Sequence, residues 1–102
     1  MNALFRKQVF ELIDLIPEGR VTTYGAIAKA IGYPNHARHV GNALTNYGDD
    51  FPAHRVCGAG GKITTESCLE KFTIKLKREG VGVAGNRISN FGNVFWDPLD
   101  EL

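Results

Sequence analysis

The residues of this chain that could carry out covalent chemistry are few, and two of them stand together as His54 and Arg55. A histidine beside an arginine suits a general base next to a group that stabilises an oxyanion. The residue before them is Ala53, whose methyl side chain offers no lone pair for nucleophilic attack. The pair therefore has no nucleophile beside it to activate.

The two cysteines, Cys57 and Cys68, are the other candidates for chemistry. They do not make a disulfide framework, so we expect reduced, buried or inert thiols in a cytoplasmic protein. With a histidine they could ligate zinc, but the paired spacing of a zinc site is missing. We expect neither a metal nor a cofactor.

The elements that must position these residues include two short helices close in sequence. Thr23 can cap the first of them, residues 24–31, and Pro34 fixes a sharp turn before the second, about 36–46. Two short helices joined by such a turn predict a helix-turn-helix over about 23–46.

The second of these helices has two different faces. Ala37, Val40 and Leu44 fall on one side at three- and four-residue steps, which suits packing against the domain. The other side is small and polar apart from one long cation, and it carries Arg38, Gly41, Asn42 and Thr45. Such a face could approach a DNA strand closely, although by itself it also fits a solvated helix.

Helical spacing of apolar residues predicts a further amphipathic helix over 3–16. The glycine-rich stretch 57–61 predicts a hairpin or loop that lines a pocket, within a pocket loop of 51–66. Ser67 and Glu70 have the spacing of a capping box for a fourth helix.

The last part of the chain predicts a small β wing over about 81–96, because glycines and asparagines alternate there with Val, Ile and Phe. Two or three strands are expected, with turns near Gly85-Asn86 and Gly92-Asn93. The fold class is therefore mainly α with a small β wing.

Length and charge fit one DNA-reading domain over residues 1–102. The formal net charge is only +1, but residues 1–48 hold five basic and three acidic groups. Residues 69–96 hold five basic and two acidic groups, and the last six residues hold three carboxylates. The acidic end hides two basic regions, which are expected where phosphates are neutralised. A signal peptide and a long apolar run are both lacking, so no membrane partner is expected.

The stretch Pro52-Ala53-His54-Arg55-Val56 resembles the Pro-Cys-His-Arg-Val active-site motif of the O6-alkylguanine-DNA alkyltransferases, with alanine in place of the cysteine. Val21-Thr22-Thr23-Tyr24-Gly25 and Ala37-Arg38-His39-Val40-Gly41 precede it in the family's order, and Glu79-Gly80-Val81 follows it. On this succession the chain is identified as a member of the alkyltransferase-like proteins. The resemblance implies a winged helix-turn-helix-like DNA-binding domain of the alkyltransferase C-terminal type.

The same resemblance implies roles for individual residues. Arg38 would be the arginine finger that occupies the gap left by an extruded nucleotide, and Tyr24 would help to turn that nucleotide about its backbone. His54 would belong to an internal hydrogen-bond network, and Arg55 would hold the loop by bonding backbone carbonyls. The implied DNA-binding residues are Thr23, Tyr24, Arg38, Gly41, Asn42 and Thr45. The implied lesion pocket consists of Tyr24, Leu44, Pro52, Ala53, Val56, Ile63 and Thr64.

The implied function is a non-catalytic one, since the reactive sulfur is missing at position 53. The protein would bind O6-alkylguanine in duplex DNA through the minor groove, flip the nucleotide, and present the lesion to nucleotide excision repair proteins, as a monomer. Two alternatives remain. A plain helix-turn-helix regulator would read base edges in the major groove. A residual alkyltransferase would need Cys57 as acceptor, although in-line attack tolerates little misplacement of the sulfur.

Overall fold

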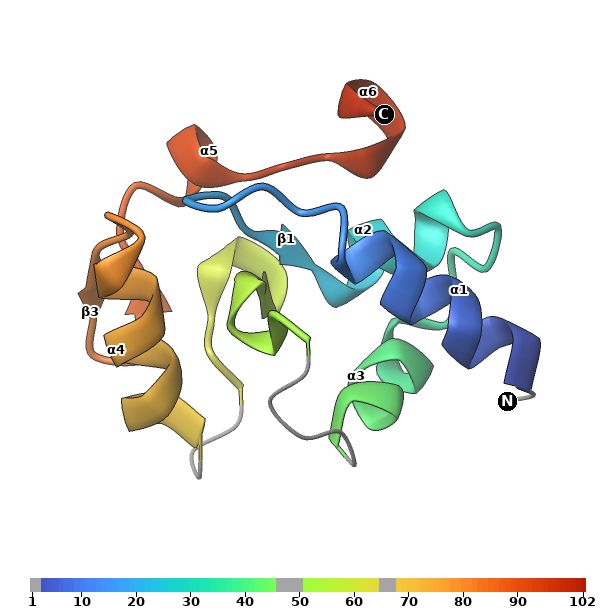
Figure 1. Ribbon diagram of the computed structural model, residues 1–102, viewed down its shortest axis with the longest axis horizontal. Coiled ribbons are helices and arrows are strands. Elements are labelled where there is room, and N and C mark those ends of the chain that lie inside the picture. Colours follow the sequence, from blue (N-terminus) through green and yellow to red (C-terminus); the bar gives the residue numbers. More distant parts are fainter. Residues whose placement is uncertain (1–2, 46–50, 65–67) are drawn as a thin grey trace.

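A computed structural model describes residues 3–45, 51–64 and 68–102 of the chain. Six helices, two short 3₁₀ helices and four two-residue strands follow one another over these residues (Figure 1). Their order is α1 (Ala3–Ile13), β1 (Thr22–Thr23), α2 (Tyr24–Ala30), α3 (Ala37–Thr45), η1 (Ala53–Arg55), β2 (Val56–Cys57), η2 (Ala59–Gly61), α4 (Leu69–Arg78), β3 (Val83–Ala84), β4 (Arg87–Ile88), α5 (Phe91–Val94) and α6 (Pro98–Glu101). The mainly helical fold with small sheets agrees with the sequence prediction.

The predicted helix-turn-helix is formed by α2 and α3. The Thr23 hydroxyl accepts a hydrogen bond from the amide of Ala26 at 3.0 Å, so Thr23 caps α2 as expected. Gly32, at φ +91°, then takes a left-handed conformation that favours glycine and ends the first helix. The predicted end of the motif, Asn46, lies outside the described residues.

The amphipathic helix α1 is three residues shorter than predicted. Its apolar face is buried through Phe5, Val9 and Ile13. After Ile13 the backbone continues in tighter turns, in which the amide of Ile16 donates to the carbonyl of Ile13 at 3.1 Å. Pro17 follows, and helices usually end before a proline because its ring disfavours the helical conformation of the preceding residue.

The centre of the molecule is a small parallel ladder. β1 pairs with β2 through Thr22 opposite Val56 and Thr23 opposite Cys57. On the other side of β1, Val21 forms a parallel bridge with Phe95. The helix-turn-helix therefore starts from a strand that is held between the pocket loop and the C-terminal segment.

The wing is smaller than predicted. β3 and β4 pair as an antiparallel hairpin around the predicted turn at Gly85-Asn86. The second predicted turn, at Gly92-Asn93, is wrong: these residues belong to the one-turn helix α5. The end of α5 is instead held to a distant segment, because the amide of Val21 donates to the carbonyl of Val94 at 2.9 Å and Val21 bridges to Phe95.

The capping box predicted for the fourth helix involves Ser67, which lies outside the described residues. The residue at the N-cap position of α4 is Cys68, whose side chain makes no capping hydrogen bond. The helix itself is confirmed and ends at Arg78, just before the glycine at position 80 with φ +84°.

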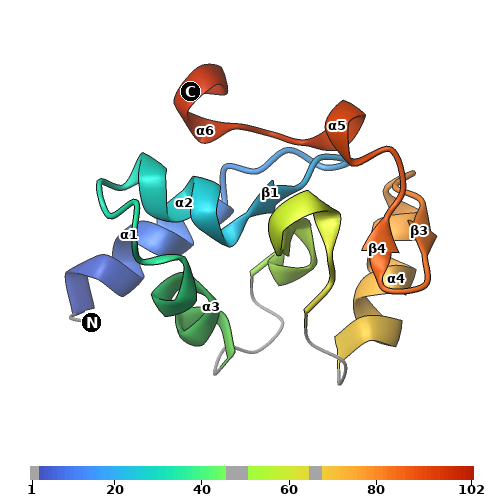
Figure 2. The same cartoon turned by 180° about the vertical axis from the view of Figure 1, so that it is seen from behind.

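The C-terminal segment crosses one face of the molecule from α5 to α6 (Figures 1 and 2). Arg20 fixes it: the guanidinium donates to both carboxylate oxygens of Glu101 at 3.0 and 2.8 Å and to the carbonyls of Val94 and Phe95. Arg20 also lowers the pKa of Glu101. One carboxylate of the acidic end is thus paired within the fold.

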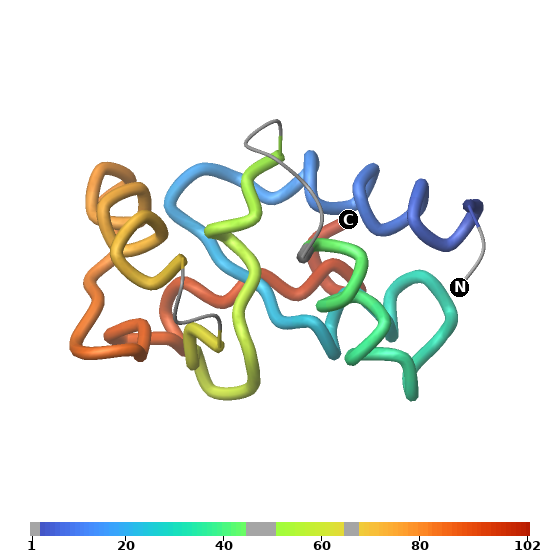
Figure 3. The backbone as a smooth tube through the Cα atoms, turned by 90° about the horizontal axis from the view of Figure 1, so that it is seen from below, coloured from blue at the N-terminus to red at the C-terminus, as the bar shows by residue number. Residues whose placement is uncertain are grey.

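The buried apolar side chains form two clusters. The helical cluster consists of the buried residues Phe5, Val9, Phe10, Leu12, Ile13, Ile16, Ile27, Ala28, Val40, Ala43, Val56 and Trp96. The wing cluster consists of Val21, Cys57, Ile63, Leu76, Val81 and Ile88. The view from below shows α1 and α3 at one end of the molecule and α4 at the other (Figure 3).

Candidate nucleic-acid interface

Helix α3 presents the polar face that the sequence predicts. Val40 is fully buried and Ala43 is 8% exposed, so this side of the helix packs into the helical cluster. Arg38 and Asn42 are exposed, and Gly41 is half-buried between them. The remaining predicted contact, Thr45, is the last residue of α3. A cation is therefore held away from the core on a helix whose neighbouring side chains are short.

Tyr24 connects this helix to the pocket loop. It is the first residue of α2, and its hydroxyl lies 3.2 Å from the hydroxyl of Thr64. A methyl group added at Gly41 would meet the Tyr24 ring at 4.0 Å, an ordinary contact, so the ring lies beside α3. Three residues predicted separately, from α2, α3 and the pocket loop, are thereby brought together. The hydroxyl of Thr23 is occupied by its capping bond.

The remaining residues of the predicted lesion pocket fall into two groups. Pro52 and Ala53 are half-buried at the start of η1, and Leu44 packs partly buried against the helical cluster. Val56 is 3% exposed within the helical cluster and Ile63 is 5% exposed within the wing cluster. Their side chains are covered in this structure, so they support the loop from the core side.

The loop that carries His54 and Arg55 is tied down by a residue that sequence reasoning missed, Glu79. Its carboxylate is 2.6 Å from Nε2 of His54 and accepts from the guanidinium of Arg55 at 2.9 to 3.1 Å. It also accepts from the amide of Gly19 at 2.8 Å. Arg55 in addition donates to the carbonyl of Ile16 at 2.9 Å. The Glu79 side chain is only 7% exposed, so it joins three segments from within the fold.

The charges of this network explain its protonation. Burial alone would raise the pKa of Glu79, but hydrogen bonds from Arg55, Gly19 and His54 outweigh it and hold the pKa at about 2. Burial lowers the pKa of His54, against the opposing effect of the Glu79 carboxylate. A neutral His54 that donates from Nε2 to Glu79 leaves Nδ1 as an acceptor, and this buried atom has no hydrogen-bond partner among the described residues.

A signal for Glu79 was present in the sequence. An acidic residue directly after the last turn of a helix faces the negative end of the helix dipole, which is an unfavourable place for a carboxylate. Three neighbours in that turn, Lys75, Lys77 and Arg78, follow the expected preference for cations. The exception indicates a specific partner, which the fold supplies as Arg55.

Cys57 is a buried thiol. The residue is 1% exposed, and its sulfur donates to the carbonyl of Thr22 at 3.3 Å. Burial raises the pKa of the thiol to about 12, and the thiol rather than the thiolate is therefore present at neutral pH. Both cysteines are free of disulfide bonds. Within the described residues, no group of three His, Cys, Asp or Glu could hold a metal ion.

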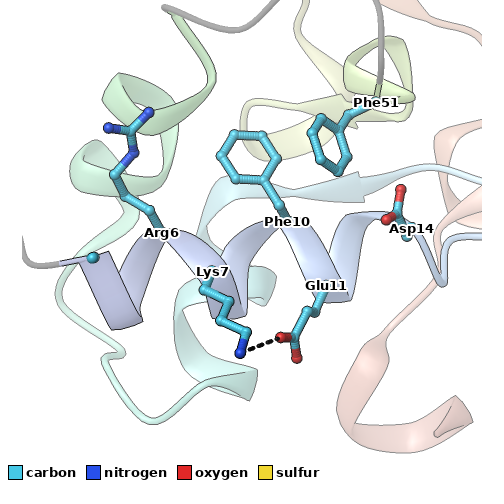
Figure 4. A pocket seen from close by; sticks show the side chains of 7 residues that line it. Arg6, Lys7, Phe10, Glu11, Asp14 and Phe51 are labelled. Atoms are coloured by element: carbon cyan, nitrogen blue, oxygen red, sulfur yellow. Dashed lines mark ion pairs between the residues drawn. The ribbon is translucent and has the colours of Figure 1, made fainter.

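A separate groove of about 650 Å³ lies over the outer face of α1 (Figure 4). Its apolar floor is formed by Phe10 and Phe51, whose ring centroids are 4.5 Å apart. Arg6 and Lys7 lie towards one end of it, and Asp14 towards the other (Figure 4). None of the residues predicted to form the lesion pocket lines this groove. No described helix is long and apolar enough to cross a membrane.

The fold and this site define a class of protein: a helix-turn-helix DNA-binding domain whose second helix stands beside a loop-walled site. Residues 4–81 match the family model described as the DNA binding domain of 6-O-methylguanine DNA methyltransferase. The chain belongs to this family.

The similar proteins include methyltransferase enzymes as well as proteins named DNA base-flipping protein or alkyltransferase-like protein. A DNA base-flipping protein of Vibrio parahaemolyticus is 46% identical over 83 residues, which cover 78% of this chain and 83% of the relative. The crystal structure of the Schizosaccharomyces pombe alkyltransferase-like protein in complex with damaged DNA containing O6-carboxymethylguanine has a TM-score of 0.87 and 30% identity. That match covers 96% of this chain and 99% of the other.

The similarity to the enzymes is more limited in extent. The O6-methylguanine methyltransferase of Mycobacterium tuberculosis has a TM-score of 0.68 and 34% identity, over 78% of this chain. This chain spans only 50% of that enzyme.

Proposed function

We propose that this protein is a non-catalytic DNA damage-recognition protein that binds O6-alkylguanine in duplex DNA and flips the modified nucleotide out of the stack. The observation that carries the proposal is the meeting of Tyr24, Thr64 and Gly41 beside the exposed face of α3 that bears Arg38. A helix with short side chains can approach the floor of the DNA minor groove closely. Arg38 can then fill the space that the extruded base leaves.

The lack of catalysis follows from Ala53, if η1 holds this residue where the enzymes of the family hold their cysteine. His54, the residue that would assist a thiol there, is bound to Glu79. The sulfur nearest in sequence, that of Cys57, is buried and protonated. The site can therefore bind an alkylated base, but among its described residues it has no side chain that could accept the alkyl group.

Because the protein would not transfer the alkyl group, it would stay bound to the lesion. The long-lived complex could then mark the lesion for repair. We include in the proposal that the protein works as a monomer in the cytoplasm and hands the lesion to nucleotide excision repair proteins. The two free thiols suit a reducing compartment. The proposal involves no cofactor and no metal.

The test compares two duplexes that differ only in one O6-alkylated guanine. We expect tighter binding to the alkylated duplex, with no transfer of a labelled alkyl group to the protein. Arg38→Ala should weaken binding to the alkylated duplex more than to the unmodified one, and a fluorescent base analogue beside the lesion should report less unstacking. Lys77→Ala on α4 is the matched loss of one exposed cation. Equal binding of both duplexes by the wild type would favour a plain helix-turn-helix regulator instead, and label on the protein would show an enzyme.

A further inference from the structure

Two cations stand opposite each other at the edge of the wing. Lys62 forms an isolated antiparallel bridge with Arg87, the first residue of β4, and both are exposed. Next to them the amide of Ile63 donates to the carbonyl of Asn86 at 2.7 Å. This bond places Lys62 and Arg87 in a non-hydrogen-bonded pair, the register in which facing side chains approach most closely.

Like charges that face each other across two strands destabilise the pair unless an anion lies between them. Among the described residues, the carboxylates that form ion pairs do so with other cations, and they are Glu11, Glu79 and Glu101. The guanidinium of Arg87 instead donates to the neutral carbonyl of Gly60 at 3.3 Å. The described part of the fold thus sets two positive charges side by side without a carboxylate to balance them.

The cation pair is continuous with the candidate DNA site. Lys62 has an extended backbone, at φ −73° and ψ 127°, and Ile63 after it is 5% exposed while Thr64 is exposed. Since side chains alternate along an extended segment, Lys62 and Thr64 lie on the same outer side. Thr64 contacts the Tyr24 hydroxyl, and the Tyr24 ring lies beside α3. Contacts therefore lead from Arg87 on the wing through Lys62, Thr64 and Tyr24 to α3.

We propose that Lys62 and Arg87 form a phosphate clamp, which holds a backbone phosphate of the DNA on the wing side of the flipped nucleotide. The proposal rests on the function proposed above. A guanidinium binds phosphate oxygens in a two-pronged geometry and an ammonium adds a point charge, so the pair suits one phosphodiester group. Contacts of this kind fix the position of the protein on the duplex and carry no sequence information.

The cations at the end of α4 provide a contrast. Lys77 and Arg78 are exposed on the last turn of α4. This turn is at the upper end of α4 in Figure 1, whereas α3 lies level with the lower part of α4. Lys77 and Arg78 lie neither on the segment 62–64 nor on β4, which carry the cation pair. They therefore supply a control in which the same charge is removed elsewhere.

The experiment measures binding to alkylated and unmodified duplexes between low and physiological salt. In Lys62→Gln/Arg87→Gln, affinity for both duplexes should fall by the same factor, and the log–log salt slope should become shallower by about 0.9, because the pair neutralises one phosphate. Lys77→Gln/Arg78→Gln should leave the slope as in the wild type. Equal slopes for the wing variant and the wild type would overturn the clamp and favour an acidic protein partner for the pair. An equal change in both variants would reduce the effect to net charge.

A charge reversal separates binding from folding. Arg87→Glu places a carboxylate opposite Lys62, so the thermal midpoint should stay level or rise while DNA affinity falls further than in Arg87→Gln. A fall in both would count against the clamp. The outcome for the proposed function is read independently, from the preference of the wild type for the alkylated duplex. Loss of that preference with altered slopes would leave the clamp standing, and preserved preference with unaltered slopes would remove the clamp alone.

Discussion

The helical cluster and the wing cluster are built in different ways. The helical cluster is larger and draws most of its residues from α1, α2 and α3, whose apolar stripes face one another. The wing cluster draws on six residues from separate segments, between Val21 and Ile88. On the wing side the polar network around Glu79 adds bonds among the α1–β1 connection, η1 and the end of α4. Apolar packing therefore holds the helices together, whereas the loop that carries His54 and Arg55 is held in addition by charged hydrogen bonds.

The variant expected to lose the most stability is Glu79→Ala. It leaves Arg55 and His54 without their carboxylate in a poorly exposed position, and we expect the free energy of unfolding to fall by about 3–5 kcal/mol. Urea unfolding at neutral pH measures the effect. Glu79→Gln retains the volume and part of the hydrogen bonding, so its loss should be smaller. A loss below about 1 kcal/mol would mean that the network stabilises the fold no more than an ordinary surface ion pair does.

The same residue predicts how stability depends on pH. The pKa of Glu79 is lowered from 4.5 to about 2, so its stabilising contribution is complete above pH 4.5 and is lost as the pH falls towards 2. The difference in unfolding free energy between the wild type and Glu79→Ala should therefore shrink over this window. A difference that stays constant down to pH 2 would mean that the carboxylate is not the stabilising group.

Ile13→Ala tests the helical cluster in the same way. Ile13 is fully buried, and the cavity left by its truncation should lower the free energy of unfolding by about 2–5 kcal/mol. Because no charge is altered, the loss should be the same at neutral pH and between pH 4.5 and 2, the range in which the loss in Glu79→Ala shrinks. Ile13→Val is the control and should cost about 1 kcal/mol. If the loss varied with pH as in Glu79→Ala, the distinction between the two clusters would fail.

The smallest effect is expected at the junction between the ladder and the helix-turn-helix. Thr23→Ala removes the hydroxyl that accepts from the amide of Ala26 and should destabilise the protein by about 1 kcal/mol. Thr23→Ser keeps the cap and should remain near the wild type. Thermal unfolding followed by circular dichroism compares the two. Equal midpoints for both variants would show that α2 is held by packing alone.

The helical part of the candidate site was the easier part to predict. Apolar spacing and the cap at Thr23 gave the positions of α2 and α3 to within a residue, so the exposure of Arg38 followed. The Gly92-Asn93 pair shows the opposite case. Its composition is that of a turn, but the residues form α5, whose end is held to Val21.

The sequence by itself determined the local structure and the family, since helix caps, apolar periodicity and the order of the motifs depend on residues close together in the chain. Only the tertiary structure decided which distant residues meet. Tyr24 and Thr64, Lys62 and Arg87, and Arg55 and Glu79 are pairs separated by 24 or more positions. Nothing local encodes such a contact, because it forms only when separate segments pack and exclude water. The chemistry of the site depends on these contacts. Tyr24, Thr64 and Arg55 could be named from the sequence one by one, but the residues that they contact could not be assigned to them.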